Sequence, residues 1–320
     1  MLHWGVMGLG NIAHRFVSSL AQFDEADFYA GASHNAQKRE EFKEKYHPAV
    51  LYENYKEMLE DEDVDVVYIA LPHGLHFKWV MESLKHGKCV LVEKPAFLTR
   101  EEAITATTYA REHHLFFMEA MKTRFIPLVE VLHRQIEKGL IGDIVRVENS
   151  FTSNSMDKVS PDSYLFDQKM GGALYDVGVY NIASILDVIK SDVTHIENDA
   201  TFKNGIDIHD KVTLTFANGA TAYFECAIDD LQNKRSGKII GTKGSIEMDY
   251  FYRPTSATVN YEGESQSVTR ELDGDDFYSE IAAVHHGISY INYEAKRMSH
   301  QDTIDEVSLL EAIHEVTYGK

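Results

Sequence analysis

The stretch GVMGLGNIAHRF, residues 5–16, places two closely spaced glycines between an apolar run and a helical pattern. Gly8, Gly10 and Ala13 match the pattern GxGxxG/A. In this pattern the first glycine permits a tight turn, the second lets the backbone approach a pyrophosphate, and the small third residue allows close packing of helix on strand. A dinucleotide phosphate would then lie on the free N–H groups of the helix N-terminus. The alternative is a purely structural glycine-rich turn in another doubly wound protein. The predicted contacts are Gly8, Gly10, Asn11 and Ile12.

The first third of the chain alternates between apolar runs and helical patterns. The runs VDVVYIAL at 64–71 and KCVLVEKP at 88–95 are continuous, as in strands that are buried on both faces. Residues 11–23, 77–87 and 101–114 are typical of helices. Strands that alternate with helices of this length predict right-handed βαβ units and a doubly wound parallel sheet.

The pattern changes after residue 122. Helical patterns continue, but most segments alternate as antiparallel strands do, for example Lys211–Ala217 and Ala220–Ala227. Asn218-Gly219 between these two strands predicts a tight hairpin with two left-handed residues. We therefore predict an α/β protein with two domains. The first, at 1–122, has a parallel sheet, and the second, at 123–320, is an α+β domain with an open, mainly antiparallel sheet.

The composition is that of an acidic globular protein. The 320 residues include 51 acidic and 31 basic side chains, which gives a formal net charge of −20. A field of that sign repels phosphate polymers and anionic bilayers, so we expect neither a nucleic-acid partner nor a membrane anchor. No segment approaches the ~18 apolar residues of a membrane helix, and none has the pattern of a secretory signal. We expect a cytoplasmic protein.

The cysteines and histidines give no sign of a disulfide framework or a metal site. The chain has two cysteines, Cys89 and Cys226, and neither lies in a CxxC pair. Sixteen histidines occur without an HExxH motif or a His/Cys cluster. We therefore expect no metal.

The end of the second predicted strand bears on the choice of cofactor. An NAD-selective site places an acid about 20 residues beyond the glycine pattern, on the ribose 2′-hydroxyl. Here Ser33 and His34 occur instead, and Lys38 and Arg39 follow on the next helix. A hydroxyl, an imidazole and a cation suit a 2′-phosphate, so Ser33, His34 and Lys38 predict NADP(H), with NAD as the alternative. A second alternative is that the two cations only decorate a solvated helix.

Two further segments lie where parallel strands end. Because ligands of open α/β sheets bind outside the carboxyl ends of the strands, Lys94 after the run at 88–93 is a candidate catalytic group. A surface lysine before a turn is the plainer alternative. The segment 71–76 occupies the equivalent end of the preceding strand, where a histidine would line the cofactor crevice or start a helix on the surface. The predicted cofactor contacts at these two strand ends are Leu71, Pro72, His73, His76, Glu93 and Lys94.

The segment GGALYDVGVY at 171–180 combines a carboxylate and a phenol. On a helix Asp176 and Tyr180 lie one turn apart on the same face, and their neighbours are apolar. Buried polar groups of this kind need partners. The spacing alone therefore favours a core tyrosine that is paired with an aspartate for stability.

Several motifs together resemble the Gfo/Idh/MocA oxidoreductase family. They are GLGNIA at 8–13, the stretch LPHGLHFKWVMESLKHGKCVLVEKPAFLT at 71–99, MEAMKTRFIP at 118–127 and GGALYDVGVY at 171–180. The resemblance is strongest to the branch with dihydrodiol dehydrogenases, NADP-dependent pentose dehydrogenases and glucose–fructose oxidoreductase. Two positions depart from it: Lys122 stands where related sequences often have tryptophan, and His34 where NADP-using relatives often have arginine.

The resemblance implies a Rossmann domain, a substrate-binding and dimerisation domain, and homodimers formed through the open sheet. It also implies hydride transfer between NADP(H) and the carbinol or carbonyl carbon of a small polyol, sugar or vicinal diol. In the residues that match, Tyr180 is the acid/base, Lys94 polarises the substrate oxygen, and Asp176 orients Lys94 or a substrate hydroxyl. An ammonium beside a phenol favours the phenolate, which makes tyrosine a usable base. The alternatives are an NAD-dependent sugar or inositol dehydrogenase, a non-catalytic NADP(H)-binding redox sensor, and a structural partner protein.

Overall fold

The chain forms two compact units, and each takes a segment from late in the sequence. The computed structural model describes residues 1–160 and 163–319. The first unit contains Met1–Lys122 and Asp273–Ile304, and the second contains Thr123–Leu272 and Asp305–Lys320. The sequence pattern predicts that everything after 122 belongs to one domain. In the structure, residues 273–304 cluster with the first unit instead.

The first unit is built on a six-stranded parallel sheet in the order β3-β2-β1-β4-β5-β6. Its strands are β1 (Leu2–Met7), β2 (Ala26–Ala32), β3 (Val50–Tyr52), β4 (Val66–Ile69), β5 (Cys89–Glu93) and β6 (Phe117–Ala120). The central strands β1, β4 and β5 are nearly continuous runs of buried residues, as the sequence predicts. The strand order reverses between β1 and β4, which is where doubly wound sheets bind ligands.

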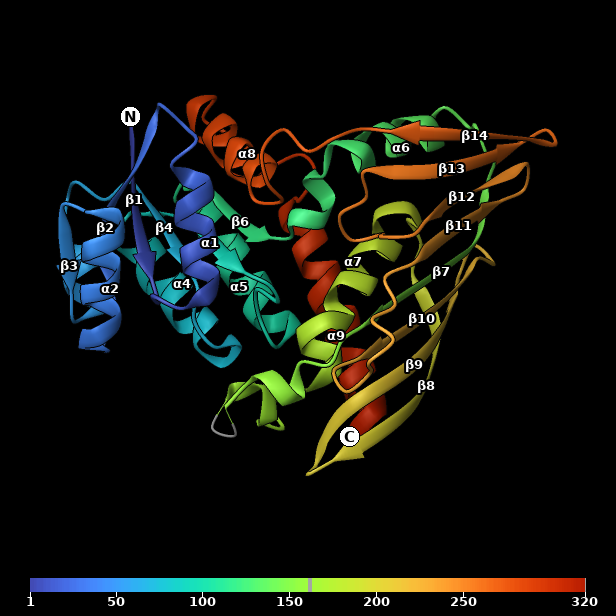
Figure 1. Ribbon diagram of the computed structural model, residues 1–320, viewed down its shortest axis with the longest axis horizontal. Helices are drawn as coiled ribbons and strands as arrows, with labels where there is room; N and C mark the ends of the chain where they lie inside the picture. Colours follow the sequence, from blue (N-terminus) through green and yellow to red (C-terminus); the bar gives the residue numbers. More distant parts are fainter. Residues whose placement is uncertain (161–162, 320) are drawn as a thin grey trace. The chain divides into compact units, whose positions relative to one another are not determined.

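Helices flank this sheet (Figure 1). They are α1 (Asn11–Leu20), α2 (Ala36–Tyr46), α3 (Tyr55–Glu60), α4 (His76–Lys85), α5 (Arg100–Glu112) and α8 (Tyr278–Ser289), with the short 3₁₀ turn η1 (His73–Leu75). A further 3₁₀ turn, η2 (Lys122–Phe125), follows β6, and only its first residue belongs to this unit. Helix α1 buries Phe16, Val17 and Leu20 on one face. Thr99 caps the N-terminus of α5, because its side chain accepts a hydrogen bond from the N–H of Glu102.

The segment 273–304 is fixed to the first unit through α1 and β1. Ser19 donates a hydrogen bond to Asp275 at 2.8 Å, and Arg15 forms an ion pair with Asp276. The indole N–H of Trp4 lies 3.2 Å from Nε2 of His285. These contacts join residues more than 250 positions apart, which a reading of local patterns does not detect.

The second unit contains an eight-stranded sheet in the order β14-β13-β12-β11-β7-β10-β9-β8. Its strands are β7 (Ile144–Thr152), β8 (Val193–Lys203), β9 (Ile206–Phe216), β10 (Thr221–Ala227), β11 (Gly237–Gly241), β12 (Gly244–Met248), β13 (Ser256–Tyr261) and β14 (Glu264–Thr269). Within the described residues, β7 and β10 form the one parallel pair of this sheet. The prediction of a parallel sheet followed by a mainly antiparallel one is confirmed.

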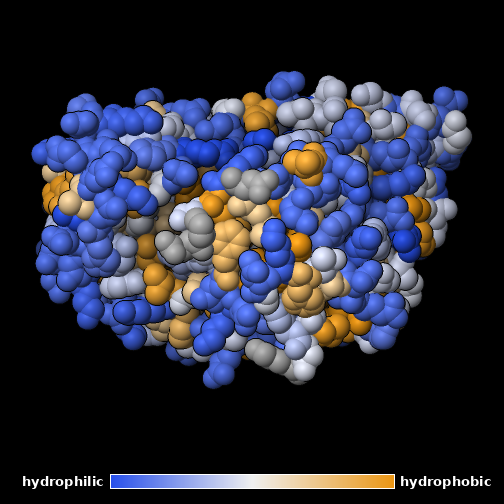
Figure 2. Space-filling view, turned by 60° about the horizontal axis from the view of Figure 1, so that its bottom comes forward, coloured by the Kyte–Doolittle hydropathy of each residue, from blue (hydrophilic) through white to orange (hydrophobic). Residues whose placement is uncertain are grey.

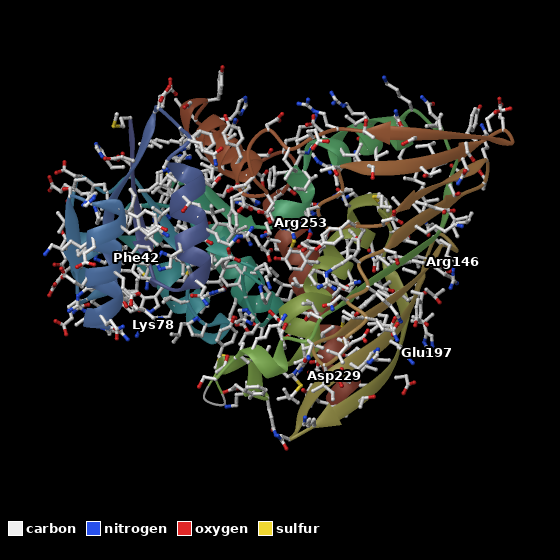
Figure 3. All side chains as sticks on the ribbon, in the orientation of Figure 1. Phe42, Lys78, Arg146, Glu197, Asp229 and Arg253 are labelled. Carbon is white, nitrogen blue, oxygen red and sulfur yellow. The ribbon has the colours of Figure 1, made fainter. Side chains whose placement is uncertain are left out.

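Helices cover one face of the second sheet (Figure 1). They are α6 (Pro127–Glu137), α7 (Val179–Val188) and the later part of α9 (His300–Tyr318), and the unit also has the short turns η3 (Met156–Lys158), η4 (Tyr164–Phe166) and η5 (Leu174–Gly178). Val212, Leu214 and Phe216 of β9 are buried beneath them. On the opposite face, which no described helix covers, Arg146 and Glu197 extend outward (Figure 3).

The hairpins of this sheet differ in one detail from the prediction. Asn218-Gly219 does connect β9 to β10, but only Gly219 has a positive φ, of 85°. The pair of left-handed residues occurs at Asn204-Gly205, with φ of 54° and 85°, between β8 and β9. The same arrangement recurs at Glu262-Gly263 between β13 and β14. Two-residue loops need this conformation because it matches the twist of the strands.

The surface is hydrophilic over most of the face shown in Figure 2, in keeping with the high content of charged residues. In the part of the chain that the structure describes, no helix has both the length and the apolarity needed to cross a membrane.

Candidate functional site

The glycine-rich turn joins β1 to α1 and leaves the N-terminus of the helix open. Gly8 has a φ of +93°, and a Cβ there would lie 2.4 Å from the carbonyl oxygen of Ala70. A Cβ at Gly10 would meet nothing within 4 Å. Helix α1 has no side-chain cap and no acidic residue in its first turn. An open surface, uncapped N–H groups and the positive end of the helix dipole fit a pyrophosphate.

The end of β2 presents the residues that are predicted to select the cofactor. Ser33 is buried, and its hydroxyl accepts a hydrogen bond at 3.2 Å from the N–H of Asn35, which caps α2. His34 is exposed and packs on Tyr55, with ring centroids 4.6 Å apart. Lys38 is exposed, and no ion pair reaches its ammonium among residues 1–160 and 163–319. A hydroxyl, an imidazole and a cation therefore lie on adjoining segments.

Arg39 has a supporting position beside this strand end. Its guanidinium donates a hydrogen bond at 2.6 Å to the carbonyl oxygen of Ser33. It also lies 3.6 Å from the carboxylate of Glu53. Arg39 thus stabilises the backbone at the end of β2, and its charge is partly balanced by the exposed Glu53.

His76 is a support within the loop after β4. Its side chain is completely buried, with Nδ1 2.9 Å from the carbonyl oxygen of Pro95 and Nε2 2.8 Å from that of Leu71. Burial lowers the pKa of the imidazole, so the ring is neutral. His76 therefore connects the loops that follow β4 and β5. Both of its nitrogens face protein carbonyls, which differs from the direct cofactor contact that the sequence predicts.

Lys94 follows β5 at the edge of the sheet that also holds the glycine-rich turn. The register pairs Met7 with Ile69 and Ile69 with Val92, so all three strands end at the same level. The peptide bond between Lys94 and Pro95 is cis. Glu93, just before Lys94, accepts a hydrogen bond from the hydroxyl of Tyr68. His73 and Leu71 are both buried in the neighbouring loop.

A set of buried charged groups lies around Lys122 in the first unit. The Lys122 ammonium is 2.9 Å from the carboxylate of Asp276 and 4.3 Å from the ring centroid of Phe277. Glu280 is completely buried, and neither of its carboxyl oxygens has a hydrogen-bond partner. Burial, reinforced by the charge of Glu93, raises the pKa of Glu280 well above its usual value. The charge of Lys122 is thus balanced within its own unit.

The motif GGALYDVGVY does not form a regular α-helix throughout. Leu174–Gly178, which includes Asp176, is a π-helical turn, and Tyr180 is the second residue of α7. The one-turn spacing expected of an α-helix therefore does not apply between Asp176 and Tyr180. Asp176 is half-buried, whereas Tyr180 is only 8% exposed. Single π-helical turns inside helices are frequent at functional sites.

Tyr180 lies in a cluster of aromatic rings at the end of β7. Its ring stacks on Phe151 at a centroid distance of 5.4 Å and lies 5.6 Å from that of Tyr252. Phe151 and Tyr252 are themselves stacked at 4.5 Å. No local sequence pattern identifies these partners, because they come from separate strands and loops.

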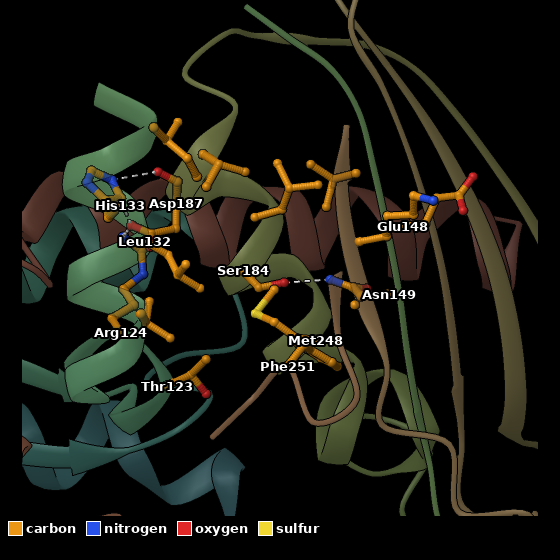
Figure 4. Close-up of a pocket in the computed structure, with 17 residues that line it drawn as sticks. Thr123, Arg124, Leu132, His133, Glu148, Asn149, Ser184, Asp187, Met248 and Phe251 are labelled. Carbon is orange, nitrogen blue, oxygen red and sulfur yellow. Dashed lines mark hydrogen bonds and ion pairs between the residues drawn. The ribbon is translucent and has the colours of Figure 1, made fainter. Parts of the chain in front are cut away.

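A small cavity of about 40 Å³ lies elsewhere in the second unit, between α6, α7 and the sheet. Figure 4 shows it between Leu132, Met248 and Phe251, with polar pairs His133–Asp187 and Asn149–Ser184 at its margins. Its volume is enough for a few water molecules. None of the predicted catalytic residues lines it.

The predicted residues thus fall into two groups. The first unit brings the glycine-rich turn, the end of β2, the loop 71–76 and Lys94 to one edge of its sheet. The second unit carries Asp176 and Tyr180. Among the described residues, no group of three or more His, Cys, Asp or Glu side chains is arranged to hold a metal ion.

Comparison with known proteins gives a consistent result along the chain. Residues 2–121 match a family described as an oxidoreductase family with an NAD-binding Rossmann fold, and residues 129–247 match the GFO/IDH/MocA C-terminal domain. The trans-1,2-dihydrobenzene-1,2-diol dehydrogenase of Mus musculus is 30% identical over 284 residues, which cover 86% of this chain and 82% of the relative. The Sus scrofa enzyme of the same name is 31% identical over 266 residues, 82% of this chain and 78% of the relative.

Solved structures share the fold at lower identity. Levoglucosan dehydrogenase, in complex with NADH and L-sorbose, superposes with a TM-score of 0.89 at 20% identity and covers 99% of this chain and 97% of its own. KijD10, a 3-ketoreductase from Actinomadura kijaniata in complex with NADP and TDP-benzene, gives 0.86 at 24% identity and covers 98% and 96%.

The family predicted from the motifs is therefore confirmed. The two family matches follow one another along the chain, and the relatives that match over most of their length are dehydrogenases. The chain is an enzyme of the Gfo/Idh/MocA family, an NAD(P)-dependent oxidoreductase that acts on CH–OH donors.

Proposed function

We propose that this enzyme transfers a hydride between NADP(H) and the carbinol or carbonyl carbon of a small polyol, sugar or vicinal diol. The observation that carries the proposal is that Lys94 directly follows β5 at the sheet edge that also bears the open glycine-rich turn. The names of the relatives support a diol, and the named complexes of similar fold support sugar-like ligands. When bound, the nicotinamide accepts or supplies the hydride.

The preference for NADP(H) rests on the end of β2. Ser33, His34 and Lys38 offer a hydroxyl, an imidazole and an unpaired cation to a 2′-phosphate. The strand end carries no acid for a ribose 2′-hydroxyl, although Glu53 approaches from a neighbouring loop. Of the two similar folds described above, one holds NADP and the other NADH. The alternative that these observations leave is NAD-dependent oxidation of a sugar or inositol.

We assign the proton to Tyr180 and the stabilisation of negative charge to Lys94. During oxidation the phenolate of Tyr180 accepts the hydroxyl proton, and the Lys94 ammonium stabilises the oxygen as the carbonyl forms. In reduction Tyr180 returns the proton. Asp176 orients Lys94 or a substrate hydroxyl. The low exposure of Tyr180 in an aromatic cluster supports this role, because exclusion of water strengthens charge interactions at the reacting oxygen.

A substrate panel tests the proposal. Aldoses, ketoses, polyols and vicinal diols are assayed by nicotinamide absorbance with NADP⁺ and with NAD⁺. Turnover that favours NADP⁺ supports the proposal, and turnover that favours NAD⁺ identifies the sugar or inositol dehydrogenase alternative. Tight NADPH binding in calorimetry without turnover of any member identifies a redox sensor.

We also propose a homodimer formed through the helix-free face of the second sheet. Charged side chains such as Arg146 and Glu197 on that face would then lie at or near the interface. Sedimentation equilibrium gives the mass directly, and a mass near the monomer value of 36.4 kDa at micromolar concentration would contradict the proposal.

A further inference from the structure

Two arginines lie among the aromatic rings around Tyr180, and the proposed mechanism uses neither. We call this set the Tyr180 cluster. It consists of Phe151, Tyr180, Arg235, Tyr250, Tyr252 and Arg253, all in the second unit.

The rings of the cluster run from the interior toward solvent. Phe151, Tyr180 and Tyr252 are 7–9% exposed, whereas Tyr250 is 37% exposed. The hydroxyls of Tyr250 and Tyr252 are 3.1 Å apart and hydrogen-bonded. One end of the cluster is therefore in contact with water, while its other end is the ring of the proposed acid/base.

Arg235 is a cation with unused hydrogen-bonding capacity. Its guanidinium lies 4.3 Å from the ring centroid of Phe151 and donates to the carbonyl oxygen of Lys234 at 2.7 Å. Its Nε is buried and has no hydrogen-bond partner. In the described part of the chain no carboxylate forms an ion pair with it. Neighbouring Lys234 differs, since its ammonium pairs with Glu225 at 2.8 Å.

Arg253 brings a second positive charge to the same place. Its guanidinium lies 5.2 Å from the ring centroids of both Tyr250 and Tyr252, and it donates to the Tyr250 hydroxyl at 3.3 Å. The charges of Arg253 and Arg235 both act on Tyr250 and Tyr252. The cluster is thus a positive region in a protein of net charge −20.

Arg235 is half-buried, and the buried part of a guanidinium is costly unless acceptors satisfy its donors. Arg235 has five N–H donors in a fixed planar fork, and this fork matches the paired oxygens of a carboxylate or phosphate. Stacking on Phe151 holds the fork in place but satisfies none of its donors. Among the described residues no carboxylate pairs with this fork, so the half-buried Arg235 side chain is suited to bind an oxyanion on a bound molecule.

We propose that the substrate of this enzyme carries an oxyanion, a carboxylate or phosphate, that Arg235 binds with help from Arg253. This inference rests on the proposed function, since the substrate must reach Tyr180 with its reacting hydroxyl while its oxyanion contacts Arg235. Centroid spacings of 4.3 Å and 5.4 Å separate the guanidinium from the Phe151 ring and that ring from Tyr180. A sugar-sized molecule can span this separation with its oxyanion on Arg235 and a hydroxyl at Tyr180.

The reaction remains balanced with such a substrate. The carbinol C–H bond breaks and its electron pair leaves as hydride to NADP⁺, while the O–H proton goes to Tyr180. The products are a carbonyl compound that retains its oxyanion, NADPH and one proton. The oxyanion takes no part in the bond changes, so Arg235 determines specificity rather than chemistry.

Matched substrates test the inference. Polyols of three to six carbons are compared with the aldonates and polyol phosphates of the same length and configuration. We expect kcat/KM to favour a charged member over its neutral counterpart, and the carboxylate and phosphate arms show which oxyanion is preferred. Arg235→Gln should raise KM for the preferred charged substrate by about 10- to 100-fold with little change in kcat, and its effect on neutral substrates should be much smaller.

Control variants distinguish specific binding of the oxyanion by Arg235 from a non-specific effect of removing positive charge and from loss of the folded structure. Lys238→Gln removes one positive charge from β11, where Lys238 pairs with Glu247. This variant should change neither KM nor kcat. Arg235→Lys keeps the charge but loses the fork, so it should retain part of the affinity. Thermal unfolding and NADPH binding confirm that each variant is folded.

Binding of the same panel to the protein–NADP⁺ complex by calorimetry keeps the two proposals separable. Equal kinetics and equal binding for charged and neutral members, unchanged by Arg235→Gln, would overturn the oxyanion inference and leave the proposed function intact. Selective oxyanion binding that Arg235→Gln abolishes, without turnover of any member, would support the inference and contradict the proposed function.

Discussion

The carboxylate of Asp207 accepts a hydrogen bond at 2.8 Å from the backbone N–H of Leu174, the first residue of the π-helical turn that carries Asp176. Asp207 is completely buried, and its other oxygen accepts a hydrogen bond from the Tyr318 hydroxyl at 2.7 Å. A Cβ at Gly172 would lie 2.1 Å from this carboxylate. Only a glycine at position 172 leaves room for the Asp207 carboxylate, and this carboxylate in turn holds the first residue of the π-helical turn in place.

We expect Asp207→Ala to lower kcat by at least about tenfold, because an unsatisfied buried N–H costs about 1–3 kcal/mol and the turn before Tyr180 would shift to relieve it. NADPH affinity should stay unchanged, since the proposed cofactor contacts all lie in the first unit. Steady-state kinetics and calorimetry measure the two effects. Asp207→Asn keeps one acceptor and should lose less activity. A lower melting temperature with unchanged kcat would show that Asp207 only stabilises the fold.

Asp210 makes the stability of the protein depend on pH. Burial and the neighbouring charge of Asp207 raise the pKa of its carboxyl to about 8, and Asn198 and Cys226 are its other polar contacts. At pH values between the ordinary pKa near 4 and the raised pKa of about 8, Asp210 holds a proton in the folded state and loses it in the unfolded state. The free energy of unfolding should therefore fall by a few kcal/mol as pH rises through this range.

Asp210→Asn should remove this fall, so the variant gains stability relative to the wild type between pH 5 and pH 8. Denaturant unfolding at several pH values measures the difference. Asp199→Asn, an exposed position on the adjoining strand β8, is the control and should keep the wild-type slope. Parallel pH profiles for the wild type and Asp210→Asn would contradict the assignment.

The strand ends of the first unit could be predicted because the information is local. Gly8 needs a positive φ next to a buried strand, and Lys94 directly follows a continuous apolar run. Each of these features is encoded within about ten residues. Such patterns specify the parallel sheet, its carboxyl edge and the residues on it.

The remaining features depend on contacts that no local pattern contains. Asp276 joins Arg15 and Lys122 from far along the chain, and Arg235 reaches the ring of Phe151 from a separate strand connection. The π-helical turn at Leu174–Gly178 was missed because a one-residue change of period is not visible in an apolar sequence. His76 was predicted at the cofactor, since the sequence does not show that two carbonyls enclose it.

Tyr180→Phe and Lys94→Ala should each lower turnover by about 10²–10⁴-fold, because one removes the proton carrier and the other the charge beside the reacting oxygen. The affinity for NADPH should persist in Tyr180→Phe. Rapid-mixing measurement of a single turnover isolates the chemical step from product release. Tyr261→Phe removes a hydroxyl that donates to Glu262 at the end of β13, outside this cluster, and is the control. Turnover at the wild-type level in either catalytic variant would refute the corresponding assignment.

His76→Ala should destabilise the first unit without removing a catalytic group. The change opens a cavity and removes the one N–H that the neutral ring can donate to the carbonyl of Leu71 or of Pro95, which together cost a few kcal/mol. His76→Gln, which can donate to one carbonyl, should recover part of the loss. Thermal unfolding with and without NADPH measures both variants. A melting temperature equal to that of the wild type in His76→Ala would show that the two loops hold their position by other contacts.

Lys38→Ala should weaken the affinity for NADPH by about tenfold and leave that for NADH unchanged. An ammonium beside a phosphate dianion contributes a charge-assisted interaction that a ribose hydroxyl cannot provide. The two dissociation constants follow from quenching of protein fluorescence or from calorimetry. Lys43→Ala on the same helix, where Lys43 pairs with Glu40, is the matched control for loss of one positive charge. If both variants weaken both cofactors equally, the effect is the general field of the helix, and the selectivity must come from Ser33, His34 or Arg39.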